Sequence, residues 1–262
     1  MIDHLPPIAR RVSTSLEVED WALAEEVPVE IGFNGQAWCV MMATPQDLED
    51  LAIGLALTEG AILSAAAIRS IETKSWPEGM TVDMSVDPTS LQRNHIRRRT
   101  LDGRTGCGLC GVESLADLHA PTALQTPAAR LPDSAFAAAF EALPAHQPLN
   151  RTTHSVHAAA WCDGHGKILA VREDVGRHNA LDKLVGACLR EESLDPDGFV
   201  VMSSRCSYEL VIKAARLGAR ALATISAPTG FSLDLSLALN LDLVTLGPGR
   251  RLVRFTETQN GR

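Results

Sequence analysis

The chain has 262 residues, of which 45% are hydrophobic and 21% charged, with a formal net charge of −8 at pH 7. This composition is typical of a globular protein, and the acidic balance argues against a general nucleic-acid binder. No apolar run is long enough to span a membrane and the first residues lack a signal-peptide pattern, so we expect a cytoplasmic protein without a membrane partner.

The first half of the sequence predicts an arm followed by a small α+β portion. Residues 1–26 are polar with weak pattern and predict a loosely packed arm. Asn34-Gly35 is a strong hairpin signal, because both turn positions need positive φ. Thr44 and Pro45 have the residue types of a helix N-cap and first turn. The predicted elements are strands at 27–33 and 36–43, a helix at 44–60, and strands at 68–76 and 80–87.

In the second half, strands and helices alternate with short connections. This order predicts an α/β lobe with a mixed sheet covered by helices. The predicted strands lie at 157–162, 167–171, 199–202, 221–225, 241–246 and 252–256, and the predicted helices at 114–118, 134–143, 177–189, 207–217 and 230–239. The Ala/Pro/Thr-rich stretch 121–132 predicts a linker. We therefore divide the chain into an N-terminal α+β portion, 1–120, and an α/β lobe, 121–262, with the boundary within 110–150.

Two of the six cysteines differ from the others in their surroundings. Cys39, Cys162 and Cys188 lie in apolar runs, which predicts buried small hydrophobes. Cys107 and Cys110 lie instead in the loop Thr-Gly-Cys-Gly-Leu-Cys-Gly, after an arginine-rich segment. The glycines give access, and nearby arginines favour thiolate over thiol. This pattern predicts a reactive thiol, either nucleophilic or sulfur-carrying.

Three other interpretations of the cysteine pair stay open. A structural zinc site needs four ligands, and the sequence has no second Cys-x-x-Cys. A thioredoxin-like dithiol should open a helix directly after a strand, whereas arginine-rich loop precedes this pair. A tight glycine turn with idle thiols is the third. The arginines before the loop are either a solvated face or a surface for an anionic partner.

A second signal is the charged stretch 171–179, Val-Arg-Glu-Asp-Val-Gly-Arg-His-Asn, which joins a predicted strand to a predicted helix. A helix start offers unpaired N–H groups to a phosphate, Gly176 lets a ligand approach the backbone, and Arg177 and His178 could complete an anion site. A charged cap with solvated surface ion pairs is an equally good interpretation of this stretch.

Three predicted loops form the last signal. Ser203-Ser204-Arg205, Ser226-Ala-Pro-Thr229 and Gly247-Pro-Gly-Arg-Arg251 each follow a predicted strand. If these strands are parallel, the loops meet at the carboxyl edge where open α/β sheets bind ligands. Their residue types suit a nucleotide or pterin carrying phosphates, although plain tight turns would look similar. No dinucleotide-binding or phosphate-loop motif is present.

Together these motifs resemble the formate dehydrogenase accessory sulfurtransferase family, from about Glu26 to Thr256. The resemblance is carried by Cys107-Gly-Leu-Cys-Gly111, His157-Ala-Ala, the block 171–183 and Ser226-Ala-Pro-Thr229. It implies that Cys107 accepts persulfide sulfur from a cysteine desulfurase and passes it to the molybdenum (or tungsten) bis-guanine-dinucleotide cofactor, a bound substrate that serves formate dehydrogenase. It also implies a cytidine-deaminase-like C-terminal lobe without zinc, and a homodimer.

The resemblance assigns residues to the site as follows. Cys107 and Cys110 are the expected catalytic residues, with Cys110 assisting release or resolving the persulfide, and no metal ligand is expected. The expected cofactor-binding residues are Leu246, Gly247, Pro248, Gly249, Arg250, Arg251, Ser226, Thr229, Arg177 and His178. Family members often carry Phe and Arg where this chain has Leu246 and Pro248, and the stretch 203–206 is a variant of a more Gly-rich one. A non-catalytic, cofactor-binding chaperone for apo-formate dehydrogenase is the alternative to a sulfurtransferase.

Overall fold

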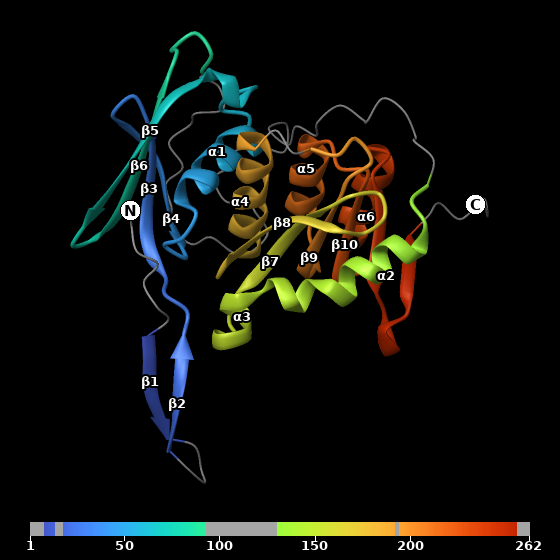
Figure 1. Cartoon of the computed structure of the whole chain (residues 1–262). Helices are drawn as coiled ribbons and strands as arrows, with labels where there is room; N and C mark the ends of the chain where they lie inside the picture. The colour runs from blue at the N-terminus through green and yellow to red at the C-terminus, as the bar shows by residue number, and fades with distance from the viewer. Residues whose placement is uncertain (1–7, 14–17, 93–129, 192–193, 256–262) are drawn as a thin grey trace.

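The computed structural model describes residues 8–13, 18–92, 130–191 and 194–255, with side chains from residue 22 onward. Within these ranges the chain forms a six-stranded sheet, a four-stranded sheet and a separate β-hairpin, with helices between and around the two sheets (Figure 1). The predicted combination of an α/β lobe with a smaller α+β portion is therefore present. The predicted boundary between the portions stays a prediction.

The six-stranded sheet has the order β12-β11-β10-β9-β7-β8. Strands β9, β10 and β11 are parallel, β7 runs antiparallel to both β8 and β9, and β12 runs antiparallel to β11. The sheet is therefore mixed, as predicted. Its strands are β7 (His157–Cys162), β8 (Ile168–Asp174), β9 (Phe199–Cys206), β10 (Ala221–Pro228), β11 (Asp242–Leu246) and β12 (Leu252–Phe255).

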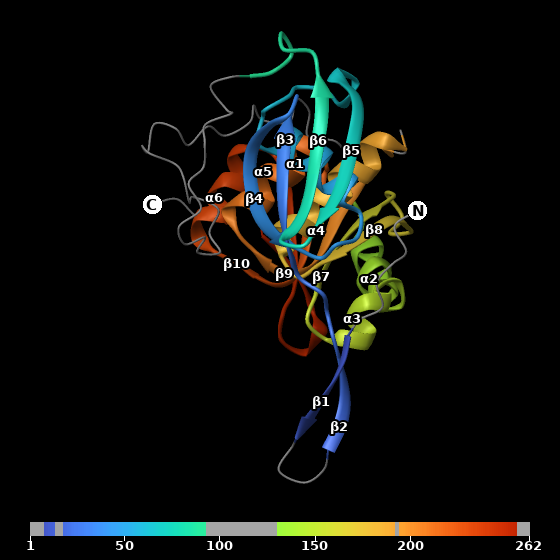
Figure 2. The same cartoon turned by 90° about the vertical axis from the view of Figure 1, so that its left-hand side faces the viewer.

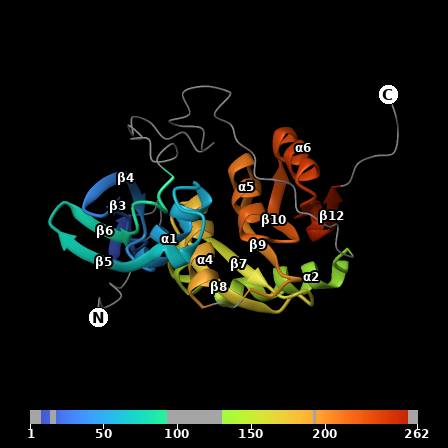
Figure 3. The ribbon, with the colours of Figure 1, turned by 90° about the horizontal axis from the view of Figure 1, so that it is seen from above.

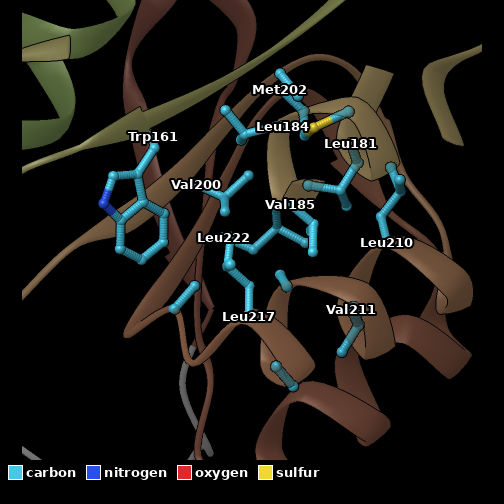
Figure 4. Packing of buried hydrophobic residues seen from close by; sticks show 14 of the residues in the cluster. Trp161, Leu181, Leu184, Val185, Val200, Met202, Leu210, Val211, Leu217 and Leu222 are labelled. Atoms are coloured by element: carbon cyan, nitrogen blue, oxygen red, sulfur yellow. The ribbon is translucent and has the colours of Figure 1, made fainter. Parts of the chain in front are cut away.

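Helices cover both faces of this sheet because successive strand residues point to opposite sides. Val200 and Met202 pack with helices α4 and α5 (Figure 4). On the other face, Phe199 and Val201 pack with Phe136 of α2. The lobe thus buries two apolar layers. Its helices are α2 (Asp133–Ala142), α3 (Pro148–Thr153), α4 (Arg177–Arg190), α5 (Tyr208–Leu217) and α6 (Gly230–Ala238).

The N-terminal portion contains a four-stranded sheet of order β4-β3-β6-β5, in which β3 and β6 are parallel. Helix α1 packs against this sheet and separates it from the larger lobe (Figure 3). Its elements are β3 (Val27–Phe33), β4 (Gln36–Ala43), α1 (Leu48–Thr58), β5 (Ile68–Trp76) and β6 (Gly79–Val86). The strands agree closely with those predicted, and Asn34 and Gly35 both have positive φ as the hairpin requires.

The structure corrects three predictions. The predicted arm contains a hairpin of β1 (Ile8–Ser13) and β2 (Val18–Leu23), which extends away from the body (Figure 2). Thr44 is not the N-cap of α1, because its N–H bonds to Asp174 and the cap position is Asp47. Finally, β9 and β10 continue to Cys206 and Pro228 through irregular pairing, so the predicted loop residues 203–205 and 226–228 are strand residues. The predicted helix at 114–118 lies outside the described residues.

A close helix crossing joins the two portions. Helices α1 and α4 cross where Gly54 of one faces Gly186 of the other, and both glycines are buried. A Cβ atom on Gly54 would overlap the carbonyl oxygen of Asp182, and one on Gly186 would overlap that of Asp50. The two backbones therefore touch directly, which only glycine permits at these positions.

A buried ion pair lies beside this crossing. Lys183 Nζ lies 2.7 Å from Asp174 Oδ2, and both side chains are fully buried. The same Nζ donates to the carbonyl oxygen of Thr44 at 2.9 Å, and the Thr44 N–H donates to Asp174 at 3.0 Å. Because a buried charge without its partner is strongly destabilising, this contact fixes the segment before α1 to the larger lobe.

A second buried ion pair lies near the other end of α1. Lys213 Nζ donates to both carboxylate oxygens of Asp182 at 2.8 Å and to Oγ1 of Thr58 at 2.9 Å. Burial lowers the pKa of Lys213, but the charges of Asp182, Glu59 and Glu209 outweigh it and hold the pKa above its ordinary value. Lys213 therefore stays a cation, bonded to both portions of the chain.

No helix in the described ranges combines the length and the apolar character needed to cross a lipid bilayer.

Replacing Gly54 or Gly186 by alanine inserts a methyl group where backbone already lies, so the helices must separate. We expect each variant to reduce the free energy of unfolding by about 1–3 kcal/mol, and to lower the melting temperature in thermal circular dichroism by roughly 3–10 °C. Gly230→Ala is the matched control, since its Cβ would meet nothing within 4 Å, and it should melt no earlier than the wild type. A Gly54→Ala protein with an unchanged melting temperature would contradict the close crossing.

Candidate functional site

All ten predicted cofactor-binding residues lie along one edge of the six-stranded sheet. Because β8, β9, β10 and β11 point the same way and β7 points the opposite way, their carboxyl ends meet the amino end of β7 at this edge. Helices α4, α5 and α6 begin there. The three predicted loops follow β9, β10 and β11, and the prediction that these strands are parallel with adjacent carboxyl ends is confirmed. The edge brings together Arg177, His178, Ser226, Thr229, Leu246, Gly247, Pro248, Gly249, Arg250 and Arg251.

The stretch 246–251 forms the tight turn between β11 and β12. The N–H of Gly247 donates to the carbonyl oxygen of Arg251 at 2.7 Å, and Gly249 and Arg250 have φ of 68° and 59°. Leu246 is half-buried and packs against the core, whereas Arg250 and Arg251 are exposed. The turn therefore presents two guanidinium groups at the edge, and the backbone geometry is that of a tight turn.

The residues that follow β10 form the N-terminal cap of α6. Thr229 is the N-cap of α6, where its Oγ1 accepts the N–H of Ser232 at 3.3 Å and its own N–H donates to Ser232 Oγ at 3.0 Å. Such a reciprocal capping box engages the Thr229 hydroxyl within the protein. Phe231, in the first turn of α6, is 55% exposed and stacks on Tyr208 with ring centroids 5.1 Å apart. The edge thus has an exposed aromatic face beside its polar groups.

The charged stretch 171–179 is largely internal. Asp174 and Glu173 are buried, and Glu173 accepts the N–H groups of Leu149 and Asn150 at the start of α3. Burial raises the pKa of Glu173, although those two hydrogen bonds oppose the rise. The interpretation of this stretch as solvated surface ion pairs is therefore wrong for its acidic residues. Arg177 and His178, in the first turn of α4, are half-buried at the sheet edge.

His178 makes side-chain contacts to the start of the next helix. Its Nδ1 lies 2.9 Å from Oε2 of Glu209, and its Nε2 lies 3.3 Å from Oγ of Ser207. Burial by itself raises the pKa of Glu209, but the hydrogen bond from His178 and the charges of His178 and Lys213 outweigh it and lower the pKa below its ordinary value. Glu209 is therefore an ionised carboxylate that orients His178.

Sequence reasoning missed Ser207 and Glu209 as site residues. The two residues follow β9 directly, where a Ser and a Glu look like an ordinary helix start. Their link to His178 is between two helices, so local sequence gives no sign of it. The one signal that could have revealed them is topological: the β8–α4 and β9–α5 connections reach the same edge of the sheet, so the starts of α4 and α5 lie close together.

His157 adds a titratable ring at the amino end of β7. The side chain of neighbouring Ser203 accepts the N–H of Ala158 at 2.7 Å, which ties the ends of β7 and β9 together. Burial lowers the pKa of His157, the positive charges of Arg177 and His178 lower it further, and Asp174 opposes them. His157 is therefore neutral at pH 7, in an environment that disfavours additional positive charge and favours an anion.

The cysteines divide into two groups. Cys39, Cys162, Cys188 and Cys206 are buried, as predicted for the first three. Burial raises the pKa of Cys162, Cys188 and Cys206 to about 12. Thiols with such pKa values stay protonated and unreactive at physiological pH. The predicted reactive pair, Cys107 and Cys110, lies outside the described residues. Within the described ranges, no three His, Cys, Asp or Glu side chains are grouped to hold a metal ion.

Curated relatives match this chain over most of its length. Proteins named sulfur carrier protein FdhD include one from Xanthomonas campestris pv. campestris, 42% identical over 250 residues that cover 95% of this chain and 88% of the relative. Another, from Chromobacterium violaceum, is 47% identical and covers 90% of this chain and 89% of its own.

A solved structure has the same fold. The crystal structure of a putative formate dehydrogenase accessory protein from Desulfotalea psychrophila aligns with a TM-score of 0.72 and 23% identity, covering 97% of this chain and 98% of that one. The model of the FdhD/NarQ family matches residues 24–261. With that match and relatives above 40% identity across nearly the whole length, the chain belongs to the FdhD/NarQ family.

Proposed function

We propose that this protein is a sulfur carrier that receives sulfur as a persulfide on Cys107 and transfers it to a molybdenum bis-guanine-dinucleotide substrate needed by formate dehydrogenase. The observation that carries the proposal is the burial of Cys39, Cys162, Cys188 and Cys206. A persulfide carrier needs a thiolate that a partner can reach, and these buried thiols meet neither condition. The name of the relatives, sulfur carrier protein FdhD, supports the same role.

Thiol exchange accounts for the first step without any added reagent. The Cys107 thiolate attacks the terminal sulfur of the desulfurase persulfide, the new S–S bond forms on Cys107, and the S–S bond to the desulfurase breaks. The desulfurase cysteine departs as a thiolate. In this proposal Cys110 assists release or resolves the persulfide. The protein then acts as a cytoplasmic sulfurtransferase, works as a homodimer, and has a cysteine desulfurase and formate dehydrogenase as partners.

The sheet edge supports an anionic nucleotide as the sulfur acceptor. Arg250 and Arg251 are exposed there, and Arg177 and His178 lie at the start of α4. Guanidinium groups and helix N-termini suit phosphates. Phe231 exposes its ring beside them, and an aromatic face stacks well on a purine base. A guanine nucleotide combines both features, a flat base and a diphosphate.

Alkylation of the native protein should separate the two groups of cysteines. Six cysteines less the four buried ones leaves two. We expect iodoacetamide at pH 8 to add no more than two groups to the native chain, on Cys107 and Cys110, as read by intact-mass and peptide mass spectrometry. In denaturant, all six thiols should react. Because the pKa of Cys162, Cys188 and Cys206 is about 12, these thiols should stay protonated and unlabelled when the pH is raised to 9. Rapid native labelling of Cys206 would argue against the assignment.

The sulfur carrier itself is tested by mass. Wild-type protein incubated with a cysteine desulfurase and cysteine should gain one sulfur, about 32 Da, that a reductant removes. Cys107→Ala should gain none, and Cys39→Ala, which removes a buried thiol, should gain it normally. Cys110→Ala should still load sulfur if Cys110 acts only in release. Loading of Cys107→Ala to the wild-type level would refute the role of Cys107.

A non-catalytic chaperone would behave differently in a reconstitution assay. Cys107→Ser keeps the size of the side chain but cannot form a persulfide. If the protein is a chaperone, the Cys107→Ser variant should still activate apo-formate dehydrogenase. If it is a sulfur carrier, the variant should not.

A further inference from the structure

The β1–β2 hairpin has fewer neighbours than a hairpin of its size needs. In the part of the chain that the structure describes, β1 and β2 pair only with each other, and β2 lies beside the short helix α3. The hairpin extends away from the body (Figure 1 and Figure 2). A two-stranded hairpin is only marginally stable in water, and unpaired strand edges readily bind another chain. Such a hairpin therefore gains stability from a further contact.

The face of the four-stranded sheet that is turned away from α1, here called the outer face, carries an apolar row. The strand register places Met42, Pro28, Gly79 and Trp76 side by side across the four strands. Met42 and Trp76 are 46% and 54% exposed, and Val40 in the next row is 37% exposed. Figure 2 looks onto the outer face, and the hairpin leaves the body at the end where this row lies. Adjacent exposed hydrophobic side chains mark a contact surface.

The outer face and β1 have opposite charges. The two rows next to the apolar row carry three carboxylates, Glu30, Glu72 and Asp83, against one ammonium group, that of Lys74. Lys74 Nζ lies 2.9 Å from Glu72 Oε2, so these two charges compensate each other and the balance is negative. Strand β1 contains two arginines and no acidic residue, whereas β2 contains two acidic residues and no basic one. Strand β1 is therefore the complement of the outer face.

A second copy of the chain can cover the hairpin and the apolar row at once. The hairpin extends away from its own sheet, so it does not reach its own apolar row (Figure 2). In a twofold dimer each hairpin would lie on the partner's outer face, and the same contact would be made twice without leaving either surface open. Six strand residues span about 20 Å, and four strands side by side are about as wide. One hairpin is thus long enough to cross the partner's row.

We propose that the protein dimerises by exchanging its β1–β2 hairpins, with β1 of each copy lying on the outer face of the partner's four-stranded sheet, over Met42 and Trp76. The inference rests on the homodimer named in the proposed function and adds the interface that forms it. No covalent bond forms or breaks in this step.

Two variants damage the two halves of this contact separately. Trp76→Glu places a charge in the apolar row, and Arg10→Glu with Arg11→Glu reverses the charge of β1. We expect each to raise the dimer dissociation constant about tenfold or more, because an aromatic anchor or a complementary charge is lost. Sedimentation velocity of the full-length protein over a dilution series measures this constant. Leu63→Glu is the matched control, since Leu63 is 78% exposed and lies outside the sheet, and its dimer should be as stable as that of the wild type.

Mixing the two variants distinguishes hairpin exchange from other ways of forming a dimer. Each variant alone has both contacts damaged, whereas a mixed dimer keeps one intact contact. In that contact, the unchanged hairpin of Trp76→Glu lies on the unchanged outer face of the arginine variant. Native mass spectrometry, with one variant isotopically labelled, should therefore find mixed dimers in excess of both homodimers.

Three results overturn the inference. The first is a wild-type protein that stays monomeric throughout the dilution series, which includes the case of a hairpin that binds a different protein. The second is a dimer whose dissociation constant neither variant changes. The third is a mixture that contains no mixed dimers. Circular dichroism checks that the variants fold, and Met42→Glu takes the place of Trp76→Glu if that variant does not.

Sulfur loading on Cys107, measured in the same samples, separates this interface from the carrier role. A monomeric wild type that loads sulfur removes the interface and leaves the carrier role in place. A dimer that exchanges hairpins but loads no sulfur removes the carrier role and leaves the interface.

Discussion

The crossing of α1 and α4 is the constraint on which the rest of the structure depends. Gly54 and Gly186 bring the two backbones into contact, so no side chain can separate the helices there. Groups flanking such a tight crossing cannot reach water, and they must find partners inside the protein. Asp174 with Lys183, and Asp182 with Lys213, meet this requirement. The close crossing therefore requires the buried ion pairs beside it.

The second ion pair also connects the crossing to the sheet edge. Lys213 bonds Asp182 and Thr58 at the crossing, and its charge helps to keep Glu209 ionised. Glu209 in turn orients His178 at the edge. A disturbance of the α1 contact would therefore reach the candidate site through a short series of buried charges. Such a series gives the site a fixed electrostatic environment, which is what pre-organised anion recognition requires.

The sequence predicted the secondary structure well where periodicity and turn chemistry act alone. The strands at 27–33, 36–43, 68–76 and 157–162 have the predicted bounds, because alternation and the Asn34-Gly35 turn are local signals. The parallel order of β9, β10 and β11, and so the common edge, followed from strand–helix alternation. Thr44 was misassigned because its hydrogen-bonding partner, Asp174, is distant in sequence. Local propensity cannot reveal a partner of that kind.

The candidate site was predicted only in part, because some of its contacts join residues that are distant in sequence. The edge and its arginines followed from topology, but Ser207 and Glu209 did not, because their role appears only when α4 and α5 lie side by side. The charged stretch 171–179 suggested either an anion site at Gly176, Arg177 and His178 or a charged cap with surface ion pairs, and most of its charges contact protein. Arg172 bonds Asp50 on α1, and Asn179 donates to the carbonyl oxygen of Met42. A charged stretch between a strand and a helix can therefore serve two purposes at once. Residues pointing toward α1 hold the two portions together, while Arg177 and His178 lie half-buried at the sheet edge, in the first turn of α4.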